Sequence, residues 1–471
     1  MSSTIAVAEL QVGMFIHLDG GWLSHPFPLS SFRLTSPEQI ATIRGLGLAR
    51  VRWSPEKSTH LDPVADPAAA PAAGFAAGGS ASGASPRSPT GVAVNAAVGA
   101  APGTASAAGM GAASVASFGS PGGVGTAESA ARRHRELLAA QRETQQQCER
   151  QFGEAASAWR AACDAVASRP DESREAAHGL AHAMVEKLAV SNDIGIRLVS
   201  GVSGDRPAAH ALNVSVVSLL LGRALGMRGG DLLDLGVGAL MHDLGKLELP
   251  ERARHLEPGA SSTETQAYRD HVARGVTLGK AMQLSEGALA VLAQHHEHAD
   301  ASGFPQRLAG ERIALAGRVV ALVNRYDNLC NPPGRVPPLT PHEAVSMLFA
   351  QGRSKYDAAV LNAFIRMMGV YPAGSLVQLT DDRFAMVVGV NSTRPLKPRV
   401  LVHDPKVPRQ EALLLDLEET PDVGIRRSLT AGKLPAPSLD YLDPRPRVAY
   451  FFEPLDGSGT THCVTPAALP A

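Results

Sequence analysis

The chain has 471 residues, a formal net charge of −1 and four cysteines. Its length exceeds what one hydrophobic core usually serves, so we expect about three domains. The near-zero net charge argues against a strong field that would attract nucleic acid or anionic lipid. The cysteines lie far apart without a CxxC pair, which argues against a disulfide framework or a zinc–thiolate site.

The N-terminus lacks the basic-then-apolar pattern of a signal peptide. The most apolar run, Val214–Leu221, is far too short to cross a bilayer. We therefore expect a cytoplasmic protein with no membrane insertion and no nucleic-acid partner.

The first segments differ sharply in composition. Residues 1–59 contain aromatics and turn signals and predict a small α+β domain with one helix near Pro37–Gly45. We hypothesise that this domain binds a protein partner or regulates the chain. Residues 60–126 are almost entirely Ala, Gly, Pro and Ser, with too little apolar surface to offset chain entropy, and predict a flexible linker.

Residues 127–183 predict a helical arm. Its first part, Ala127–Val166, is rich in Gln, Arg, Glu and Ala and should form a long, mostly exposed helix that ends before Pro170. The apolar positions are mostly Ala and show no clean heptad. The arm could form a homodimer or only separate the neighbouring domains. The alanine-rich faces of the helix do not distinguish these two possibilities.

Residues 184–371 predict a helical domain, and residues 372–471 predict a small β-rich domain. The helices expected after Pro170 are Glu172–Ala189, Ala208–Leu225, Gly230–His242, Thr263–Gly279, Ser285–His296, Ala314–Asn328 and Pro341–Gly352. The expected strands are Leu376–Leu379, Phe384–Val388, Val400–Val402 and Ala449–Phe452. The fold class is thus mainly α, with small strand-containing domains at both ends.

An adjacent His242-Asp243 pair follows an apolar helix, and Gly245 and Lys246 come next. The imidazole and the carboxylate can bind one cation, and the second carboxylate oxygen can bridge to another. Lys246, about one turn onward, could contact a phosphate or orient a nucleophilic water. A polar pair at the end of a surface helix would account for His242-Asp243 equally well. The apolar residues that precede the pair, however, favour a buried helix that places both side chains in the interior.

Further histidines occur in polar surroundings. His295 and His296 are consecutive, and consecutive helical residues point about 100° apart. We therefore expect these two imidazoles to serve two neighbouring ions rather than one. His210 and His271 are weak signals individually, because a lone histidine is more often structural, and a solvated surface would explain the His-rich stretch about as well.

The set of histidines is a stronger signal than its members. Four predicted helices each present a histidine, and helical bundles build dinuclear sites from such inward-facing side chains. Imidazole ligands suit Fe, Mn, Ni or Zn and disfavour Mg or Ca. Two such ions can clamp a phosphodiester and activate a water molecule.

Between residues 184 and 352 the ordered pattern resembles the HD-GYP family of HD phosphohydrolases, which cleave the bacterial messenger cyclic di-GMP. His242-Asp243 matches the naming pair, and HHEHADASGFP, His295–Pro305, matches the second half of the motif. The N-terminal stretch GMFIHLDGGWLSHPFPLSSF is similar to a small domain of unknown function that often precedes HD-GYP domains.

The resemblance implies a site with two divalent metal ions, of which Fe and Mn are the first candidates. Its metal ligands would be His210, His242, Asp243, His271, His295 and His296. Asp243 would bridge the ions, and Lys246 would meet the scissile phosphate or the water. The loop Gly303, Phe304 and Pro305 would shape the substrate pocket.

Several positions depart from the family pattern. Asn324 stands where the family has an aspartate ligand, so one ion would bind more weakly. Arg335 alone could replace the basic Arg-Pro-Tyr-Arg stretch that meets substrate phosphates. Arg206 replaces a glutamate that holds a third ion in some members, which argues against a third ion here. Asp327 is expected to orient a neighbouring ligand rather than to bind metal.

We therefore expect a cyclic di-GMP phosphodiesterase that produces linear pGpG and then GMP. A second hypothesis is a cyclic di-GMP receptor whose catalysis has been weakened at Asn324 and in the basic stretch. A third is an HD phosphohydrolase that acts on another nucleotide. A purely structural role for every histidine is the remaining alternative.

Overall fold

The computed structural model describes residues 3–18, 31–34, 36–58, 123–190, 194–199, 205–256, 259–334 and 336–454. Most of the predicted linker, residues 60–126, lies outside these ranges, as does Arg335. Within these ranges no helix combines the length and apolar character that a membrane span requires.

The N-terminal residues form a small α+β unit, as predicted. Its antiparallel sheet has the order β1-β4-β2-β3. The elements are β1 (Ser3–Ala6), β2 (Phe15–His17), β3 (Ser31–Arg33), α1 (Pro37–Gly45) and β4 (Arg50–Trp53). Ser36 caps the helix, and Ile16, Leu34 and Ile43 are buried in its core.

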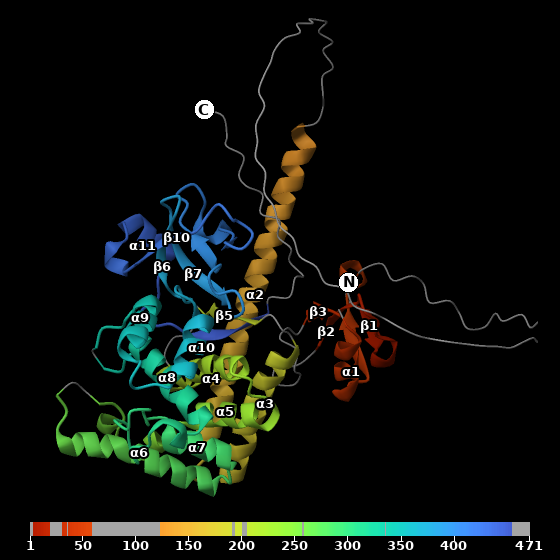
Figure 1. Cartoon of the computed structure of the whole chain (residues 1–471). Coiled ribbons are helices and arrows are strands. Elements are labelled where there is room, and N and C mark those ends of the chain that lie inside the picture. Colours follow the sequence, from red (N-terminus) through yellow and green to blue (C-terminus); the bar gives the residue numbers. More distant parts are fainter. Residues whose placement is uncertain are drawn as a thin grey trace, which may run out of the picture. The chain divides into compact units, whose positions relative to one another are not determined.

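Helices dominate the rest of the described chain (Figure 1). They are α2 (Gly123–Ala165), α3 (Pro170–Val190), α4 (Arg206–Ala224), α5 (Gly229–Met241), α6 (Ser262–Ala281), α7 (Glu286–Gln294), α8 (Leu315–Cys330), α9 (Pro341–Gln351), α10 (Ala358–Met368) and α11 (Ala436–Leu442). The periodic helices from α3 to α9 match their predicted positions to within a few residues, whereas α10 and α11 were not predicted.

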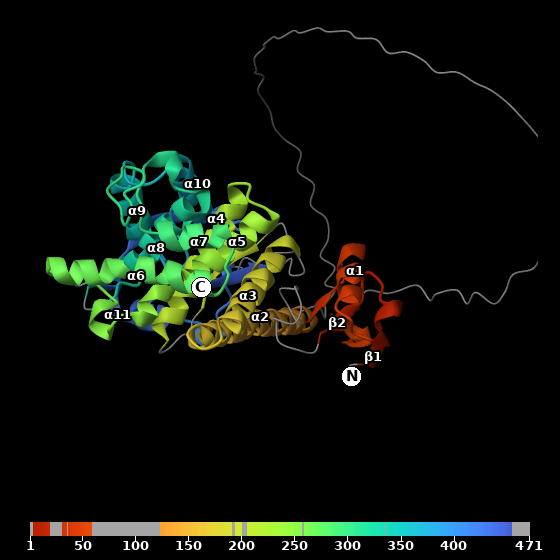
Figure 2. The same cartoon turned by 90° about the horizontal axis from the view of Figure 1, so that it is seen from below.

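Helices α4, α5, α7 and α8 pack against one another to form the centre of the bundle (Figure 2). Helix α4 is buried on every side from Ala211 to Gly222, which explains its nearly continuous apolar sequence. Side-chain caps define several helix starts, because each cap oxygen accepts a first-turn N–H. These caps are Asp205, Ser261, Ser285, Thr340 and Asp357.

The expectation that the long helix is mostly exposed is wrong for the second half of α2. Phe152, Ala155 and Ala156 belong to the main hydrophobic core. The indole N–H of Trp159 donates to the carbonyl of Leu240 in α5 at 2.8 Å. The alanine-rich face thus lets α2 approach the bundle closely instead of leaving it in solvent.

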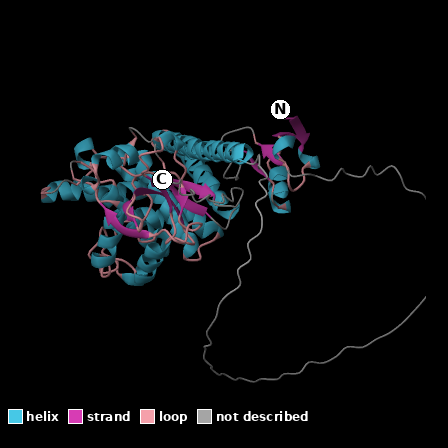
Figure 3. Cartoon of the chain, turned by 90° about the horizontal axis from the view of Figure 1, so that it is seen from above, coloured by secondary structure: helices cyan, strands magenta, loops and turns pink. Residues whose placement is uncertain are grey.

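A second sheet, shown in magenta among the cyan helices of Figure 3, has the order β10-β6-β7-β5-β11, with β8 joined to β7 and β9 to β8. Its strands are β5 (Ile194–Leu198), β6 (Leu376–Leu379), β7 (Phe384–Asn391), β8 (Arg399–Val402), β9 (Leu415–Asp416), β10 (Ile425–Leu429) and β11 (Tyr450–Pro454). All of the pairings are antiparallel.

Strand β5 was not predicted, and it lies between β7 and β11. It follows α3 and precedes α4, so the sheet extends across the predicted domain boundary at residue 372. Strand β11 also packs against α4. The C-terminal strands are therefore joined to the helical bundle through a shared sheet.

Candidate metal centre

Helix ends deliver most of the predicted ligands to one place. His242 caps the C-terminus of α5, and Asp243 follows it. His295 caps the C-terminus of α7. His210 lies in the first turns of α4, and His271 lies in the middle of α6. The helix packing thus brings together five of the residues that the sequence singled out.

Asp243 lies between two pairs of imidazoles. Its Oδ2 is 3.6 Å from Nε2 of His210 and 3.5 Å from Nε2 of His242. Its Oδ1 is 3.6 Å from Nε2 of His271 and 3.8 Å from Nε2 of His295. Two groups of candidate ligand atoms, each within 4.8 Å of one another, therefore share this one carboxylate.

Hydrogen bonds at Nδ1 fix the protonation of these imidazoles. His242, His271 and His295 place Nδ1 at 2.8, 2.5 and 3.0 Å from the carbonyl oxygens of Ala239, Tyr268 and Leu292. A carbonyl oxygen only accepts, so each Nδ1 carries the hydrogen. Each Nε2 consequently presents a bare lone pair to the centre.

This arrangement fits metal ions and is unfavourable without them. The Nε2 atoms of His210 and His242 are 3.2 Å apart, and so are those of His271 and His295. Two bare nitrogens cannot hydrogen-bond to each other, whereas nitrogens about 2.1 Å from a shared ion lie about 3 Å apart.

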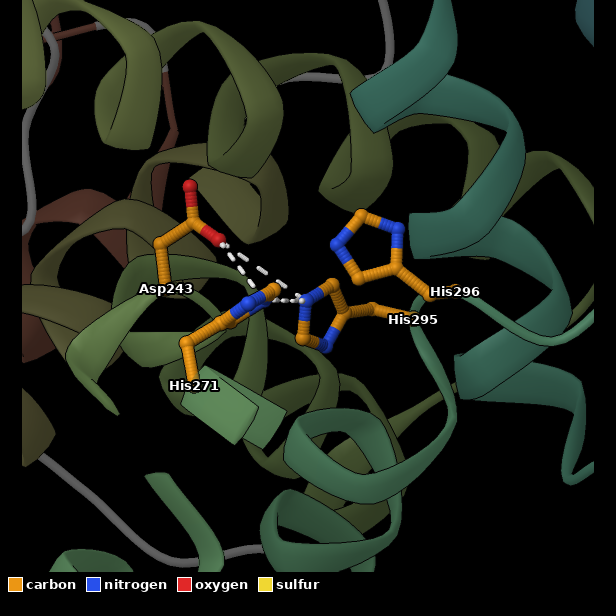
Figure 4. A group of neighbouring side chains, drawn as sticks. All are labelled: Asp243, His271, His295 and His296. Atoms are coloured by element: carbon orange, nitrogen blue, oxygen red, sulfur yellow. Dashed lines mark hydrogen bonds and ion pairs between the residues drawn. The ribbon is translucent and has the colours of Figure 1, made fainter. Parts of the chain in front are cut away.

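The Oδ1 atom of Asp243 provides a second sign that the centre suits a cation. It is buried and has no hydrogen-bond partner in the described part of the chain. Buried carboxylate oxygens usually have such a partner. Figure 4 shows this oxygen turned toward His271 and His295. The donor set and the orphaned oxygen both suit divalent transition metals.

Burial keeps three histidines of the centre neutral and therefore ready to bind metal. It lowers the pKa of His271 to about 4, and it lowers the pKa values of His295 and His296 well below their ordinary range. Burial opposes ionisation of Asp243, but Lys246 and His242 hold the pKa of this carboxyl well below its usual value. The centre thus combines neutral imidazoles at His271, His295 and His296 with one anionic carboxylate.

His296 behaves differently from the expectation. Both His295 and His296 fall within one group of candidate ligand atoms, together with His271 and Asp243, so their service to two ions stays a prediction. The expected angle of about 100° applies inside a helix, but α7 ends at Gln294 and His296 lies beyond its end. The ring of His296 stacks on Phe304, with centroids 4.5 Å apart.

Lys246 lies against the same carboxylate. Its Nζ donates to Oδ2 of Asp243 at 2.6 Å and lies 5.3 Å from the ring centroid of Tyr268. Burial opposes its charge, yet the neighbouring Asp243 raises the pKa of Lys246 above its ordinary value. The ammonium therefore stays charged at the edge of the centre.

Two glycines of the predicted motifs permit close backbone contacts. A Cβ on Gly245 would lie 1.9 Å from the carbonyl oxygen of His271. A Cβ on Gly303 would lie 2.5 Å from the carbonyl oxygen of His296. Any larger residue at either position would push a backbone segment that carries a candidate ligand.

Asp327 orients His210, in agreement with the sequence-based expectation. Its Oδ2 accepts from Nδ1 of His210 at 2.6 Å. Its Oδ1 accepts from the side-chain amides of Asn213 and Asn331, each at 2.8 Å. With both oxygens engaged, this buried carboxylate fixes the ring orientation of His210.

Asn324 is buried, and its Oδ1 accepts from Nδ2 of Asn328 at 2.6 Å. Its role as a ligand stays a prediction. Sequence reasoning missed Tyr268, whose hydroxyl is 3.5 Å from Nε2 of His296. The spacing of three residues between Tyr268 and His271 on one helix could have suggested a shared face.

The bundle and its paired imidazole groups are those of an HD domain. Residues 168–360 match the family model of the HD domain, and residues 2–177 match that of a domain of unknown function, DUF3391. The chain thus carries an HD domain preceded by DUF3391, and the second match reaches well beyond the predicted domain 1–59.

Similar curated proteins are named for the hydrolysis of cyclic dinucleotides. A cyclic di-GMP phosphodiesterase of Pseudomonas aeruginosa is 29% identical over 194 residues, 41% of this chain and 47% of that protein. The cyclic di-GMP phosphodiesterase response regulator RpfG of Xanthomonas campestris is 31% identical over 34% of this chain and 43% of its own. A 3′3′-cGAMP-specific phosphodiesterase of Vibrio cholerae is 26% identical over 39% and 36%. The chain spans less than half the length of each of these three relatives.

Proposed function

We propose that this protein is a metal-dependent phosphodiesterase that hydrolyses cyclic di-GMP. The observation that carries the proposal is Asp243, whose two oxygens face separate pairs of imidazole nitrogens. The HD-domain match covers these residues, and two relatives are named as cyclic di-GMP phosphodiesterases, which supports the choice of substrate.

Two divalent ions, iron or manganese, are the cofactors that we propose. The proposed ligands are His210, His242, Asp243, His271, His295, His296 and Asn324. When bound, such a pair of ions supplies an acidified water and offsets charge on the phosphate oxygens. The tautomers set by the Nδ1 hydrogen bonds keep the imidazole lone pairs available for these ions.

Lys246 contributes a charged donor to the reaction. Its ammonium has three N–H groups, of which one reaches Asp243, so the others can meet a phosphate oxygen. Water adds across one P–O bond, and the ring opens to the linear dinucleotide pGpG. The loop Gly303, Phe304 and Pro305 lies beside His296 and is the wall that we propose for the substrate pocket.

The test is hydrolysis of cyclic di-GMP by the purified protein supplied separately with Mn²⁺ and, without oxygen, with Fe²⁺. Chromatography should reveal pGpG, and 3′3′-cGAMP serves as a second substrate because one relative is named for it. Replacing His242 by Ala removes a proposed ligand of one ion, and replacing Asp243 by Asn removes the charge of the carboxylate that both groups share. Either change should lower kcat by about 10³-fold or more.

The matched control is His178→Ala, which removes an exposed histidine of α3. This variant should keep the activity of the unaltered protein. Undiminished cleavage by the Asp243→Asn variant would refute the assignment. Cleavage of 3′3′-cGAMP alone would move the proposal to that substrate.

A second candidate is a receptor that binds cyclic di-GMP but cleaves it slowly. The observation that favours it is the neutral amide of Asn324, whose oxygen already accepts from Asn328. The variant Asn324→Asp distinguishes the two functions. A gain in turnover of about tenfold or more would support the receptor, whereas a loss would show that the amide belongs to a working site.

A further inference from the structure

A pair of arginines converges beside the His210 end of the centre. Arg206 begins α4, one turn before His210. Its guanidinium donates to the carbonyl oxygen of Asn331 at 3.3 Å. The same Asn331 bonds to Asp327, which orients His210. Arg206 therefore lies next to the residues that hold this metal ligand.

The C-terminal segment brings Arg447 to the same asparagine. The backbone N–H of Val448 donates to Oδ1 of Asn331, and Nδ2 of Asn331 donates to the carbonyl of Val448, each at 2.9 Å. Arg447, immediately before Val448, is exposed. Its side chain has no hydrogen bond or ion pair with any residue of the described ranges.

The charges on this side of the centre are uncompensated. Burial and then the charge of Arg447 lower the pKa of Arg206. Asp327, the carboxylate whose charge acts on Arg206, is already engaged by three donors. Partial burial, and then the charges of Lys246 and Arg206, lower the pKa of His255 to about 4. A bound anion would relieve this repulsion.

We propose that Arg206 and Arg447 together bind the second, unreacting phosphate of a cyclic dinucleotide, while Lys246 faces the scissile one. A guanidinium presents parallel N–H donors that match two phosphate oxygens. This inference rests on the proposed function, since it requires a substrate with two phosphodiesters. It assigns to two other segments the role that the sequence had left to Arg335.

The experiment compares the metal-loaded variants Arg206→Gln, Arg447→Gln and Arg447→Lys on two substrates. Cyclic di-GMP has two phosphodiesters, whereas bis(p-nitrophenyl) phosphate has one. Each Gln variant should raise KM for cyclic di-GMP about 10- to 100-fold, the worth of a charge-assisted hydrogen bond. The rise in KM for bis(p-nitrophenyl) phosphate should be at least tenfold smaller. Arg447→Lys keeps the positive charge, so its KM for cyclic di-GMP should lie between those of the unaltered protein and Arg447→Gln.

Arg445→Gln is the matched control. Arg445 lies two residues away and pairs with the exposed Asp443 at 3.3 Å, so its loss should leave both KM values unchanged. An unchanged KM for cyclic di-GMP in Arg447→Gln, or equal rises on both substrates, would overturn the assignment of the pair. The proposed function fails in a different way. The unaltered protein would then cleave bis(p-nitrophenyl) phosphate but would neither bind nor cleave cyclic di-GMP or 3′3′-cGAMP. That result would contradict both the proposed function and the role of Arg206 and Arg447.

Discussion

The direction of each imidazole lone pair decides whether single residues can act together as a metal centre. Main-chain carbonyls set that direction for His242, His271 and His295, whereas a carboxylate sets it for His210. His210 therefore depends on a side chain that can be replaced without altering the backbone.

Replacing Asp327 by Asn should weaken metal binding at His210 and His242. Either orientation of the new amide would turn an NH₂ group toward an existing donor, since both carboxylate oxygens accept hydrogen bonds. We expect the affinity for the ion proposed at His210 and His242 to fall about 10- to 100-fold, while the affinity for the other proposed ion stays the same. Metal titration by calorimetry measures this change, with the exposed Asp422→Asn as the control. Equal affinities in both variants would disprove the positioning role.

The buried histidines should make the metal-free protein sensitive to acid. The pKa of His271 is about 4 in the folded chain and 6.5 in its ordinary state. The unfolded chain therefore binds more protons between these values, so stability is lost as the pH falls through this window. His271 alone should contribute up to about 3 kcal/mol to this loss.

Thermal unfolding of the metal-free protein between pH 7 and pH 4 measures this dependence. The His271→Gln variant should show a flatter fall in Tm with decreasing pH than the unaltered chain. Identical slopes for the two proteins would contradict the assigned cause.

The gathering of these residues at one place was predictable from the sequence, because four expected helices each carry a histidine. The common grouping of His295 and His296 was not, since they were treated as consecutive residues inside a helix. Arg447 was beyond reach for another reason. Its proximity to Arg206 depends on how Asn331 binds the backbone of Val448, which lies 117 residues away.

At the scale of elements, the contact between α6 and the 3-10 turn Leu244–Glu248 places His271 opposite Asp243. Gly245 allows this contact, because a Cβ there would lie 1.9 Å from one backbone atom of α6 and 2.4 Å from another. Side-chain rotation cannot relieve an overlap with backbone atoms.

We expect Gly245→Ala to destabilise the fold by roughly 2–4 kcal/mol. It should also reduce metal content, because α6 must move away from Asp243. The control is Gly432→Ala, where an added Cβ has no atom within 4 Å, and its effect should stay within about 0.5 kcal/mol. Denaturant unfolding gives both values, and equal midpoints would exclude the close-approach explanation.

Elements with strong helical periodicity could be predicted, whereas β5 could not. Its five buried residues, Ile194–Leu198, are too few to show a period, and a short apolar run is equally compatible with a buried helix. Its strand partners lie about 190 and 250 residues further along the chain. Tertiary pairing, rather than local preference, makes this segment a strand.

At the scale of the whole molecule, an ion cluster around a buried carboxylate links three strands of the shared sheet. Glu453 of β11 accepts from Arg197 of β5 and from Arg399 of β8. Its side chain is only 2% exposed. Neutralising Glu453 would leave the buried guanidinium of Arg197 and the partly buried one of Arg399 without their carboxylate partner.

Glu453→Gln should therefore cost about 3–5 kcal/mol. During denaturant unfolding of this variant, the loss of helical circular dichroism and the release of metal should still occur in a single transition, because the bundle and the sheet share β5. Glu418→Gln, which breaks an exposed pair with Arg394, is the control and should cost about 1 kcal/mol or less. Separate transitions for metal release and helix loss would refute the joint unfolding of these parts.

The side chain of Asn213 has a consequence for how the protein is made. Its amide donates to Asp327 and to the carbonyl of Val448, and its oxygen accepts from the backbone N–H of Tyr450. The support of the first candidate ligand, His210, is therefore completed by residues translated about 240 positions later. A ribosome must release the chain through Tyr450 before this half of the candidate centre reaches its final form, so a metal ion that binds at His210 would find the complete site only after strand β11 has been translated.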